Sequence, residues 1–133
     1  NAVINLCFSG KTKQEVKKML GSEAGIFSYL GTRDFREVEA RAFDRNEPEA
    51  KLIFDAFAYQ LCKDAGAMSA VLGFRVDAFV LTGGMAYSDR LCAAIEGYLG
   101  NLAPVLRLPG EEEMKALALG ALRVLQGEPA KQY

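Results

Sequence analysis

The spacing of apolar and polar positions predicts a helical first half of the chain. Thr12-Lys13-Gln14-Glu15 has the form of a capping box, and apolar residues follow it at helical spacing up to Gly21. Gly31-Thr32-Arg33-Asp34 is typical of a second helix start. We expect the apolar face of that second helix at Phe35, Val38, Ala42 and Phe43.

The longest predicted helix runs from Asn46 to about Leu72. Its start is Asn46-Glu47-Pro48-Glu49, with Asn46 as the cap, Glu49 reaching back to it and Pro48 in the first turn. Apolar residues lie almost all round this helix. That pattern is typical of a helix buried in a domain or at a subunit contact, so we expect it to support a homo-oligomer.

The second half of the chain alternates strands and helices. The pattern predicts a strand over 76–82, a helix over 88–99, a strand over 102–108 and a helix over 111–126. The first strand is apolar almost throughout, so we expect it to be buried on both faces of a parallel sheet. This order predicts the α/β class, mostly helical with a short parallel sheet. Since two strands are too few for a stable sheet, we expect further strands outside this chain.

A paired glycine after the first strand is the strongest functional signal. Gly83 and Gly84 let the backbone turn tightly and approach a ligand, and Ser88 caps the next helix. With Met85 and Ala86, they are candidates for a nucleotide site at the carboxyl end of a parallel strand. A tight turn that needs glycine for its geometry explains the pair as well, and both interpretations stay open.

Two further segments carry candidate chemistry. The Asp34-Phe35-Arg36 triplet can place an arginine on an adenine face and a carboxylate on ribose hydroxyls. Alternatively, Asp34 is a helix cap and Arg36 a solvated surface residue. The Glu111-Glu112-Glu113 run complements a helix dipole, which is the favoured explanation. Glu113 also lies above two small residues on one helical face, where a carboxylate can steer a magnesium ion.

Composition excludes several classes of function. The chain of 133 residues has a net charge of -1 and no histidine, so neither a basic nucleic-acid surface, a Ser-His-Asp site nor a histidine-ligated zinc is expected. No apolar run is long enough to cross a membrane. The three scattered cysteines predict reduced thiols in a cytoplasmic protein. Asn1-Ala2 lacks an initiator Met and is typical of an expression-tag scar. The segment from Val3 to Phe8 begins abruptly and is apolar, as in the middle of a domain, so we expect a fragment.

The ordered segments resemble the C-terminal part of the acetate and butyrate kinase family over nearly the whole chain. The glycine loop resembles the butyrate kinase form more than the acetate kinase form. The matching segments are Leu6 to Lys11, Tyr29 to Glu39, Ala58 to Gln60, Gly66 to Met68, Val76 to Ser88, Pro109 to Met114 and Ala116 to Leu125.

This resemblance implies a partial ribonuclease-H-like domain of the actin-like ATPase fold, with residues 1–133 as the C-terminal part of the second, nucleotide-binding domain. It also implies reversible phosphoryl transfer between ATP and butyrate or a related short-chain carboxylate, with magnesium, giving ADP and an acyl phosphate. By motif match, Asp34, Phe35 and Arg36 would lie beside the adenosine. Gly83 to Ala86 and Ser88 would wrap the base and ribose, and Glu113 would take the magnesium-associated position.

The phosphate-binding motifs that the family carries elsewhere are absent from this sequence, so we expect no catalytic residue here and no turnover by this chain alone. Two alternatives remain. One is a non-catalytic oligomerisation module built on the helix over 46–72. The other is a different kinase or chaperone-like ATPase of the actin-like fold, against which the segment around Asp34 argues.

Overall fold

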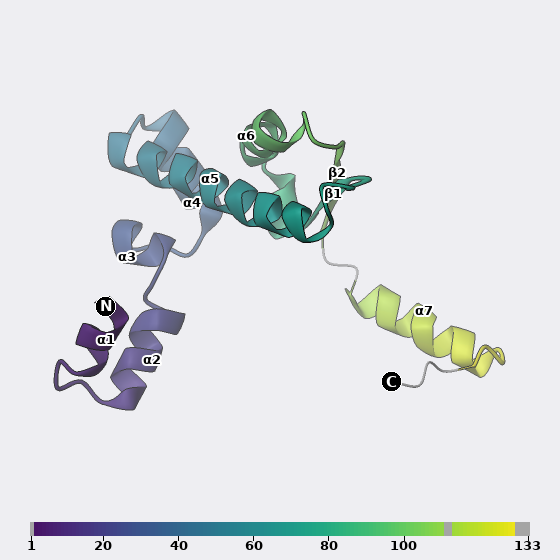
Figure 1. Cartoon of the computed structure of the whole chain (residues 1–133), viewed down its shortest axis with the longest axis horizontal. Coiled ribbons are helices and arrows are strands. Elements are labelled where there is room, and N and C mark those ends of the chain that lie inside the picture. The colour runs from purple at the N-terminus through teal and green to yellow at the C-terminus, as the bar shows by residue number, and fades with distance from the viewer. Residues whose placement is uncertain (1, 111–112, 130–133) are drawn as a thin grey trace. The chain divides into compact units, whose positions relative to one another are not determined.

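The structure, a computed structural model, describes residues 2–110 and 113–129. The chain divides into two compact units, residues 1–63 and 64–133, and each is described by itself. The elements of the first unit are α1 (Ala2–Cys7), α2 (Lys13–Gly21), α3 (Ile26–Leu30), α4 (Phe35–Glu39), the π-helical turn η1 (Ala40–Asp44) and the first part of α5 (Pro48–Val71). Figure 1 shows these elements in chain order.

The predicted capping box at the start of α2 is confirmed. The amide of Glu15 donates to Oγ1 of Thr12 at 3.3 Å, and the amide of Thr12 donates to Oε2 of Glu15 at 2.7 Å. These two bonds satisfy orphan amides at the helix start. The same contacts hold the pKa of the Glu15 carboxyl below its usual value, with the backbone amide of Thr12 as the largest cause.

The core of the first unit is an aromatic cluster between α4, η1 and α5. The ring of Phe35 lies 5.5 Å from that of Phe54 and 5.1 Å from that of Phe57, and Phe43 meets Phe54 edge to face at 4.9 Å. Phe54 and Val38 are almost completely buried, at 2% and 0% exposed. The predicted apolar face of the helix after Asp34 is therefore confirmed at Phe35, Val38 and Ala42, which are all buried.

The long helix begins one residue later than the sequence pattern suggests. Pro48 is the first residue of α5, and the amide of Lys51 donates to the carbonyl of Glu47 at 3.0 Å. Glu47 therefore occupies the cap position, and the prediction that Asn46 caps this helix is wrong. Asn46 instead adopts the left-handed conformation at φ 54°. An asparagine tolerates this conformation better than most residues, which explains its place in the turn before α5.

The second unit contains the parallel sheet. After the rest of α5 come β1 (Phe79–Gly83), the 3₁₀ turn η2 (Gly84–Tyr87), α6 (Asp89–Leu99), β2 (Val105–Pro109) and α7 (Glu113–Leu125). β1 and β2 pair in parallel, with Phe79 opposite Val105 and Gly83 opposite Pro109. The predicted parallel pair is confirmed, and both strands are shorter than predicted, because the ladder extends only over five paired residues.

Burial in the second unit differs from the prediction. Leu91, Cys92, Ile95 and Leu99 of α6 are buried. By contrast, residues of β1 alternate between half-buried and exposed, and Val80 is 51% exposed. The prediction that β1 is buried on both faces is therefore wrong for this chain. Nothing among the described residues covers the outer positions of the two-stranded sheet.

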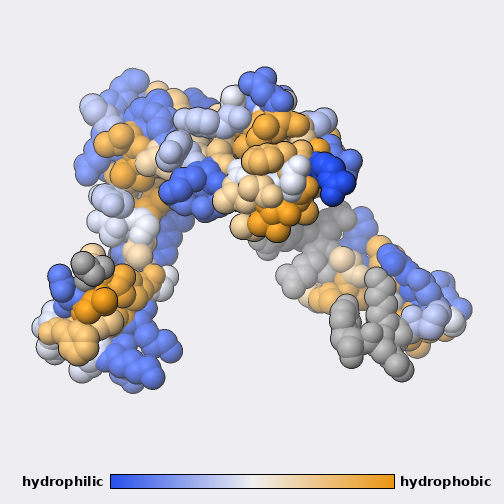
Figure 2. All heavy atoms as spheres, viewed as in Figure 1, coloured by the Kyte–Doolittle hydropathy of each residue, from blue (hydrophilic) through white to orange (hydrophobic). Residues whose placement is uncertain are grey.

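Apolar side chains remain exposed on several helices. The spacing of Met114, Leu117, Leu122 and Leu125 predicts a core face on α7. This face is open to solvent, with Met114 79% and Leu125 83% exposed, so the expected burial is wrong here. On α5, Leu52, Met68 and Val71 are exposed. Figure 2 shows hydrophobic residues on the viewed surface of α1. Since soluble domains seldom expose so many large apolar side chains, these surfaces are suited to contacts beyond this chain.

Two smaller points follow from the described residues. None of their helices combines the length and the apolar character that a membrane crossing needs. None of the three cysteines forms a disulfide; Cys7 is exposed, whereas Cys62 and Cys92 are buried. Burial raises the pKa of the Cys62 thiol.

Candidate nucleotide-binding site

The glycine pair joins β1 to η2. Gly83 has a φ of 75°, a conformation that favours glycine, whereas Gly84 has no positive φ and begins the 3₁₀ turn. A Cβ built on either residue meets no heavy atom of the described chain within 4 Å. Turn geometry therefore explains Gly83 but does not explain Gly84. Open space beside Gly84 is what a close backbone approach to a ligand requires.

Gly83 is also tied to the end of β2. The amides of Gly83 and Gly110 each donate to the other's carbonyl at 3.2 Å. Gly110 has a φ of 101°, and a Cβ there would lie 2.9 Å from the hydroxyl oxygen of Tyr87. The carboxyl ends of the two strands and the η2 turn thus form one closely fitted edge, where ligands bind in open α/β sheets.

The remaining candidate residues of this loop differ in exposure. Met85 is 43% exposed, whereas Ala86 is 3% exposed, so Ala86 presents no side chain to a ligand. Ser88 caps α6 as predicted, with its Oγ accepting from the amide of Leu91 at 2.9 Å. The cap sets the direction of α6 at the point where it leaves the loop.

Two residues that sequence reasoning missed fix this loop. Nη2 of Arg107, on β2, donates to the carbonyl of Ala86 at 3.0 Å and to Oδ1 of Asp89 at 2.9 Å. Asp89 raises the pKa of the Arg107 guanidinium above its ordinary value. A signal was present in the sequence, because Arg107 is the one charged residue in an otherwise apolar strand pattern over 102–108.

The Asp34-Phe35-Arg36 triplet lies in the first unit, at the start of α4. Asp34 caps this helix, with Oδ1 accepting from the amide of Arg36 at 3.0 Å. The guanidinium of Arg36 also donates to this carboxylate, from Nε to Oδ1 at 2.9 Å and from Nη2 to Oδ2 at 2.7 Å. Hydrogen bonds from Arg36 hold the pKa of the Asp34 carboxyl below its usual value. The Phe35 ring is turned into the aromatic core.

This geometry divides the triplet into two roles. The side chains of Asp34 and Arg36 are 46% and 89% exposed, so both are open to a ligand. Phe35 is 8% exposed, and its ring anchors α4 on α5. The prediction that Asp34 is a helix cap is confirmed. The cap leaves room for a ligand on the same carboxylate, since a carboxylate has about four acceptor positions.

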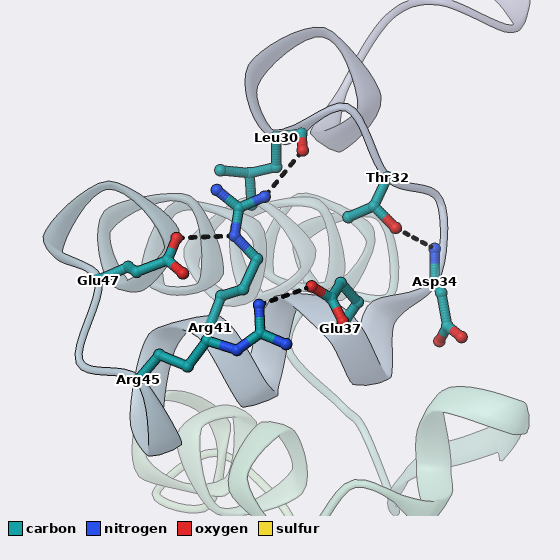
Figure 3. A network of polar contacts seen from close by, with 7 residues as sticks. All are labelled: Leu30, Thr32, Asp34, Glu37, Arg41, Arg45 and Glu47. Atoms are coloured by element: carbon teal, nitrogen blue, oxygen red, sulfur yellow. Dashed lines mark hydrogen bonds and ion pairs between the residues drawn. The ribbon is translucent and has the colours of Figure 1, made fainter.

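A polar network anchors the segment that leads to Asp34 (Figure 3). Nη1 of Arg41 donates to the carbonyl of Leu30 at 2.8 Å, and its Nε donates to Oε2 of Glu47 at 2.7 Å. Arg45 pairs with Glu37 at 3.0 Å. In Figure 3 the carboxylate of Asp34 points away from this network, while its amide donates to Oγ1 of Thr32 at 3.2 Å. Arg41 thus joins the end of α3 to the start of α5 behind the triplet.

A pocket of about 540 Å³ lies next to this segment in the first unit. Its lining includes Phe27, Thr32, Arg33 and Phe57. The Arg33 guanidinium stacks 4.5 Å from the centre of the Phe27 ring, and its Nε donates to the carbonyl of Ser22 at 3.2 Å. Arg33 is therefore held by the wall of the pocket.

The metal prediction falls largely outside the described residues. Glu111 and Glu112 are not among them, and only the backbone of Glu113, the first residue of α7, is described. Within the described part of the chain, no three acidic or cysteine side chains gather as a metal centre would need. Glu113 stays a prediction. That the triplet and the glycine loop bind the same ligand also stays a prediction, because the triplet and the loop belong to different units.

Comparison with known families decides the lineage of the chain. The profile described as the Acetokinase family matches residues 5–99, which include the triplet and the whole glycine loop. The chain belongs to this family. The resemblance that the motifs predicted is thereby confirmed, and membership implies the actin-like fold, to which a helical chain with a two-stranded parallel sheet conforms.

Individual relatives are butyrate kinases by name. The chain is 46% identical to "Butyrate kinase 1" of Clostridium acetobutylicum, over 98% of this chain and 37% of the relative. It is also 46% identical to "Probable butyrate kinase 2" of Caldanaerobacter subterraneus subsp. tengcongensis, over 95% of this chain and 36% of the relative. The chain thus spans little more than a third of the length of these curated relatives.

Proposed function

We propose that the full-length protein transfers a phosphoryl group reversibly between ATP and butyrate or a related short-chain carboxylate. Transfer from ATP to the carboxylate gives ADP and an acyl phosphate. Membership of the acetokinase family and the names of the two relatives support this choice of reaction. We further propose that the protein works in the cytoplasm, where cysteines that form no disulfide are the rule.

In this proposal the chain supplies the adenosine side of the active site, as the C-terminal part of the nucleotide-binding domain. The observation that carries it is Gly84, which neither a positive φ nor packing against the described chain requires. Gly83, Gly84, Met85 and the backbone of Ala86 and Ser88 line the base and ribose. They do not cradle the transferred phosphate, which needs several cationic or dipolar groups around it.

Asp34 and Arg36, in the first unit, are proposed as further contacts of the nucleotide. The bidentate pair holds the guanidinium plane in one orientation, in which its face can stack on an adenine ring. The Asp34 carboxylate retains acceptor positions for ribose hydroxyls. Phe35 contributes through the core, by fixing the start of α4.

The chemistry of transfer lies outside this chain. Magnesium, which ordinarily binds through substrate phosphates and one or two carboxylates, would be approached by Glu113. The residues that recognise the carboxylate substrate and the loops that bind the phosphates lie in the remainder of the protein. We therefore propose that the isolated chain does not turn over and binds ATP weakly at best.

The test is a hydroxylamine trap with the full-length protein. Butyrate and ATP should yield butyryl hydroxamate, and the yield should depend on all three of protein, ATP and carboxylate. A full-length protein that makes no hydroxamate from butyrate, isobutyrate or valerate would refute the proposed reaction. Another kinase of the actin-like fold would then remain, to be identified by ADP release with sugars.

A second candidate role is oligomerisation through α5. Its exposed apolar residues Leu52, Tyr59, Met68 and Val71 support this role, which is compatible with the kinase. Sedimentation of the full-length protein and of a Leu52→Glu variant tests it. We expect an oligomer that the substitution weakens, whereas a monomeric wild-type protein would refute the role.

A further inference from the structure

The carbonyl of Ala86 in the η2 turn accepts from two side-chain donors. Nη2 of Arg107 donates to it at 3.0 Å, and Sγ of Cys92 lies 3.6 Å from it as a second donor. The two donors come from different elements, β2 and α6. Ala86 itself is 3% exposed, so this anchor is on the inner side of the turn.

The turn depends on such tethers because of the residues that lead into it. Gly83 and Gly84 lack a Cβ, and no side chain of the described residues packs within 4 Å of a Cβ built on either. Glycine has the widest range of backbone conformations, so two in succession give the turn little orientation of its own. Its position is therefore set by what holds Ala86 and by the Gly83–Gly110 bridge.

We propose that Arg107 is a positioning residue for the adenosine loop, an inference that rests on the proposed function of that loop. Arg107 fixes the Ala86 carbonyl, and with it the orientation of the backbone at Gly84 and Met85. It acts through the loop and does not touch the nucleotide. Its second contact, to Asp89 in the first turn of α6, holds the guanidinium in place; the Asp89 side chain is 88% exposed and the Arg107 side chain 38%.

Arginine suits this position for a chemical reason. A single nitrogen, Nη2, bears two hydrogens and donates to both the Ala86 carbonyl and the Asp89 carboxylate. The planar guanidinium fixes the angle between these two bonds, whereas the ammonium of a lysine rotates freely. Lysine at position 107 would therefore keep part of the tether and lose its fixed geometry.

The experiment compares three variants in the full-length protein: Arg107→Met, Arg107→Lys and Asp89→Asn. ATP affinity is measured directly by calorimetry, and hydroxamate formation gives kcat and KM for both substrates. We expect Arg107→Met to raise the Kd for ATP about tenfold, because a loop displaced by a fraction of an ångström loses its contacts. Arg107→Lys should recover part of this loss, and Asp89→Asn should have a smaller effect. The KM for the carboxylate should not change.

A purely structural role would give another pattern. Arg107→Met would then lower the urea midpoint of unfolding, reduce kcat through loss of active protein and leave the Kd for ATP at the wild-type value, which overturns the inference. If Arg107→Met does not fold, Arg107→Lys decides, since a wild-type Kd for that variant also overturns it. The proposed function fails separately: wild-type protein that binds ATP without making hydroxamate refutes the carboxylate substrate, and the Kd comparison still tests Arg107. Wild-type protein that binds no ATP refutes both.

Discussion

The hydroxyl of Ser88 accepts a hydrogen bond from the amide of Leu91 at 2.9 Å, which ties the end of the glycine loop to the first turn of α6. Ser88 follows the η2 turn directly, and its own amide donates to the carbonyl of Met85 at 3.0 Å. The same residue thus closes the loop through its backbone and starts the helix through its side chain. Stability and loop geometry are coupled at this position.

Ser88→Ala should destabilise the full-length protein by about 1 kcal/mol, because the Leu91 amide loses its cap. Urea unfolding measures the change. Ser88→Thr keeps an acceptor oxygen and serves as the control, with stability near that of the wild-type protein. Equal stability of the alanine and threonine variants would show that the cap contributes nothing measurable.

Gly110→Ala should damage the same edge by crowding. The new Cβ would lie 2.9 Å from the Tyr87 hydroxyl oxygen, and alanine at φ 101° is strained. We expect lower stability together with a higher KM for ATP, because Tyr87 belongs to the η2 turn. Thermal unfolding and steady-state kinetics measure the two effects.

The matched control for Gly110 is Gly97→Ala on α6, where a Cβ meets nothing within 4 Å and φ is not positive. Alanine there should leave the KM for ATP unchanged and stabilise the helix by up to about 1 kcal/mol. If Gly110→Ala and Gly97→Ala have the same stability and the same KM for ATP, the close contact between Tyr87 and Gly110 does not determine the geometry of this edge.

Phe35 and Arg36 should separate into a stability effect and a binding effect. Phe35→Ala removes a ring that packs on Phe54 and Phe57, and it should cost about 3–5 kcal/mol of unfolding free energy. Arg36→Met, at an 89% exposed side chain, should leave the unfolding midpoint nearly unchanged and raise the KM for ATP. The opposite assignment, with Arg36→Met unfolding the protein and ATP affinity intact, would contradict the two roles.

The pKa of Asp34 should report its pairing with Arg36. Hydrogen bonds from the Arg36 side chain are the first cause of the lowered pKa of this carboxyl. A lowered acid pKa stabilises the folded state above the ordinary pKa of aspartate and loses that contribution as the pH falls through the folded value. In Arg36→Met the Asp34 pKa should rise toward the ordinary aspartate value, as followed by NMR of the labelled carboxyl carbon. An unchanged pKa would show that the pairing does not persist in solution.

Local signals in the sequence predicted much of the fold, and long-range contacts account for what they missed. The Thr12 capping box and the Ser88 cap were correct because short patterns determine them. The parallel pairing was correct because the order strand, helix, strand favours a parallel crossover. The extent of β1 was wrong because strand length depends on the partner, and β2 pairs only from Val105. The apolar face of α7 showed what the helix is built to bury, and it finds no cover in this chain.

In the candidate site, too, local motifs were predicted correctly and long-range contacts were missed. The glycine loop and the triplet were recognisable as motifs. Helical spacing correctly predicted that Phe35 lies on the buried face of α4, but it could not name Phe54 and Phe57 as the rings on which Phe35 packs, because those residues lie far along the chain. Arg107 was visible as a charge in an apolar strand pattern, but its role was missed because its target, a backbone carbonyl 21 residues away, has no sequence signature. Asn46 was mistaken for a cap because asparagine suits both caps and left-handed turns.

Photolabelling of the full-length protein with 8-azido-ATP tests most directly whether this chain forms the adenosine side of the site. We predict label on the tryptic peptide Val76–Arg90, which contains the glycine loop, and on the segment that contains Asp34 to Arg36. Excess ATP should protect both, and Arg36→Met should reduce the labelling. Protectable label that falls only on peptides outside these two segments would contradict the assignment of the loop and the triplet to adenosine.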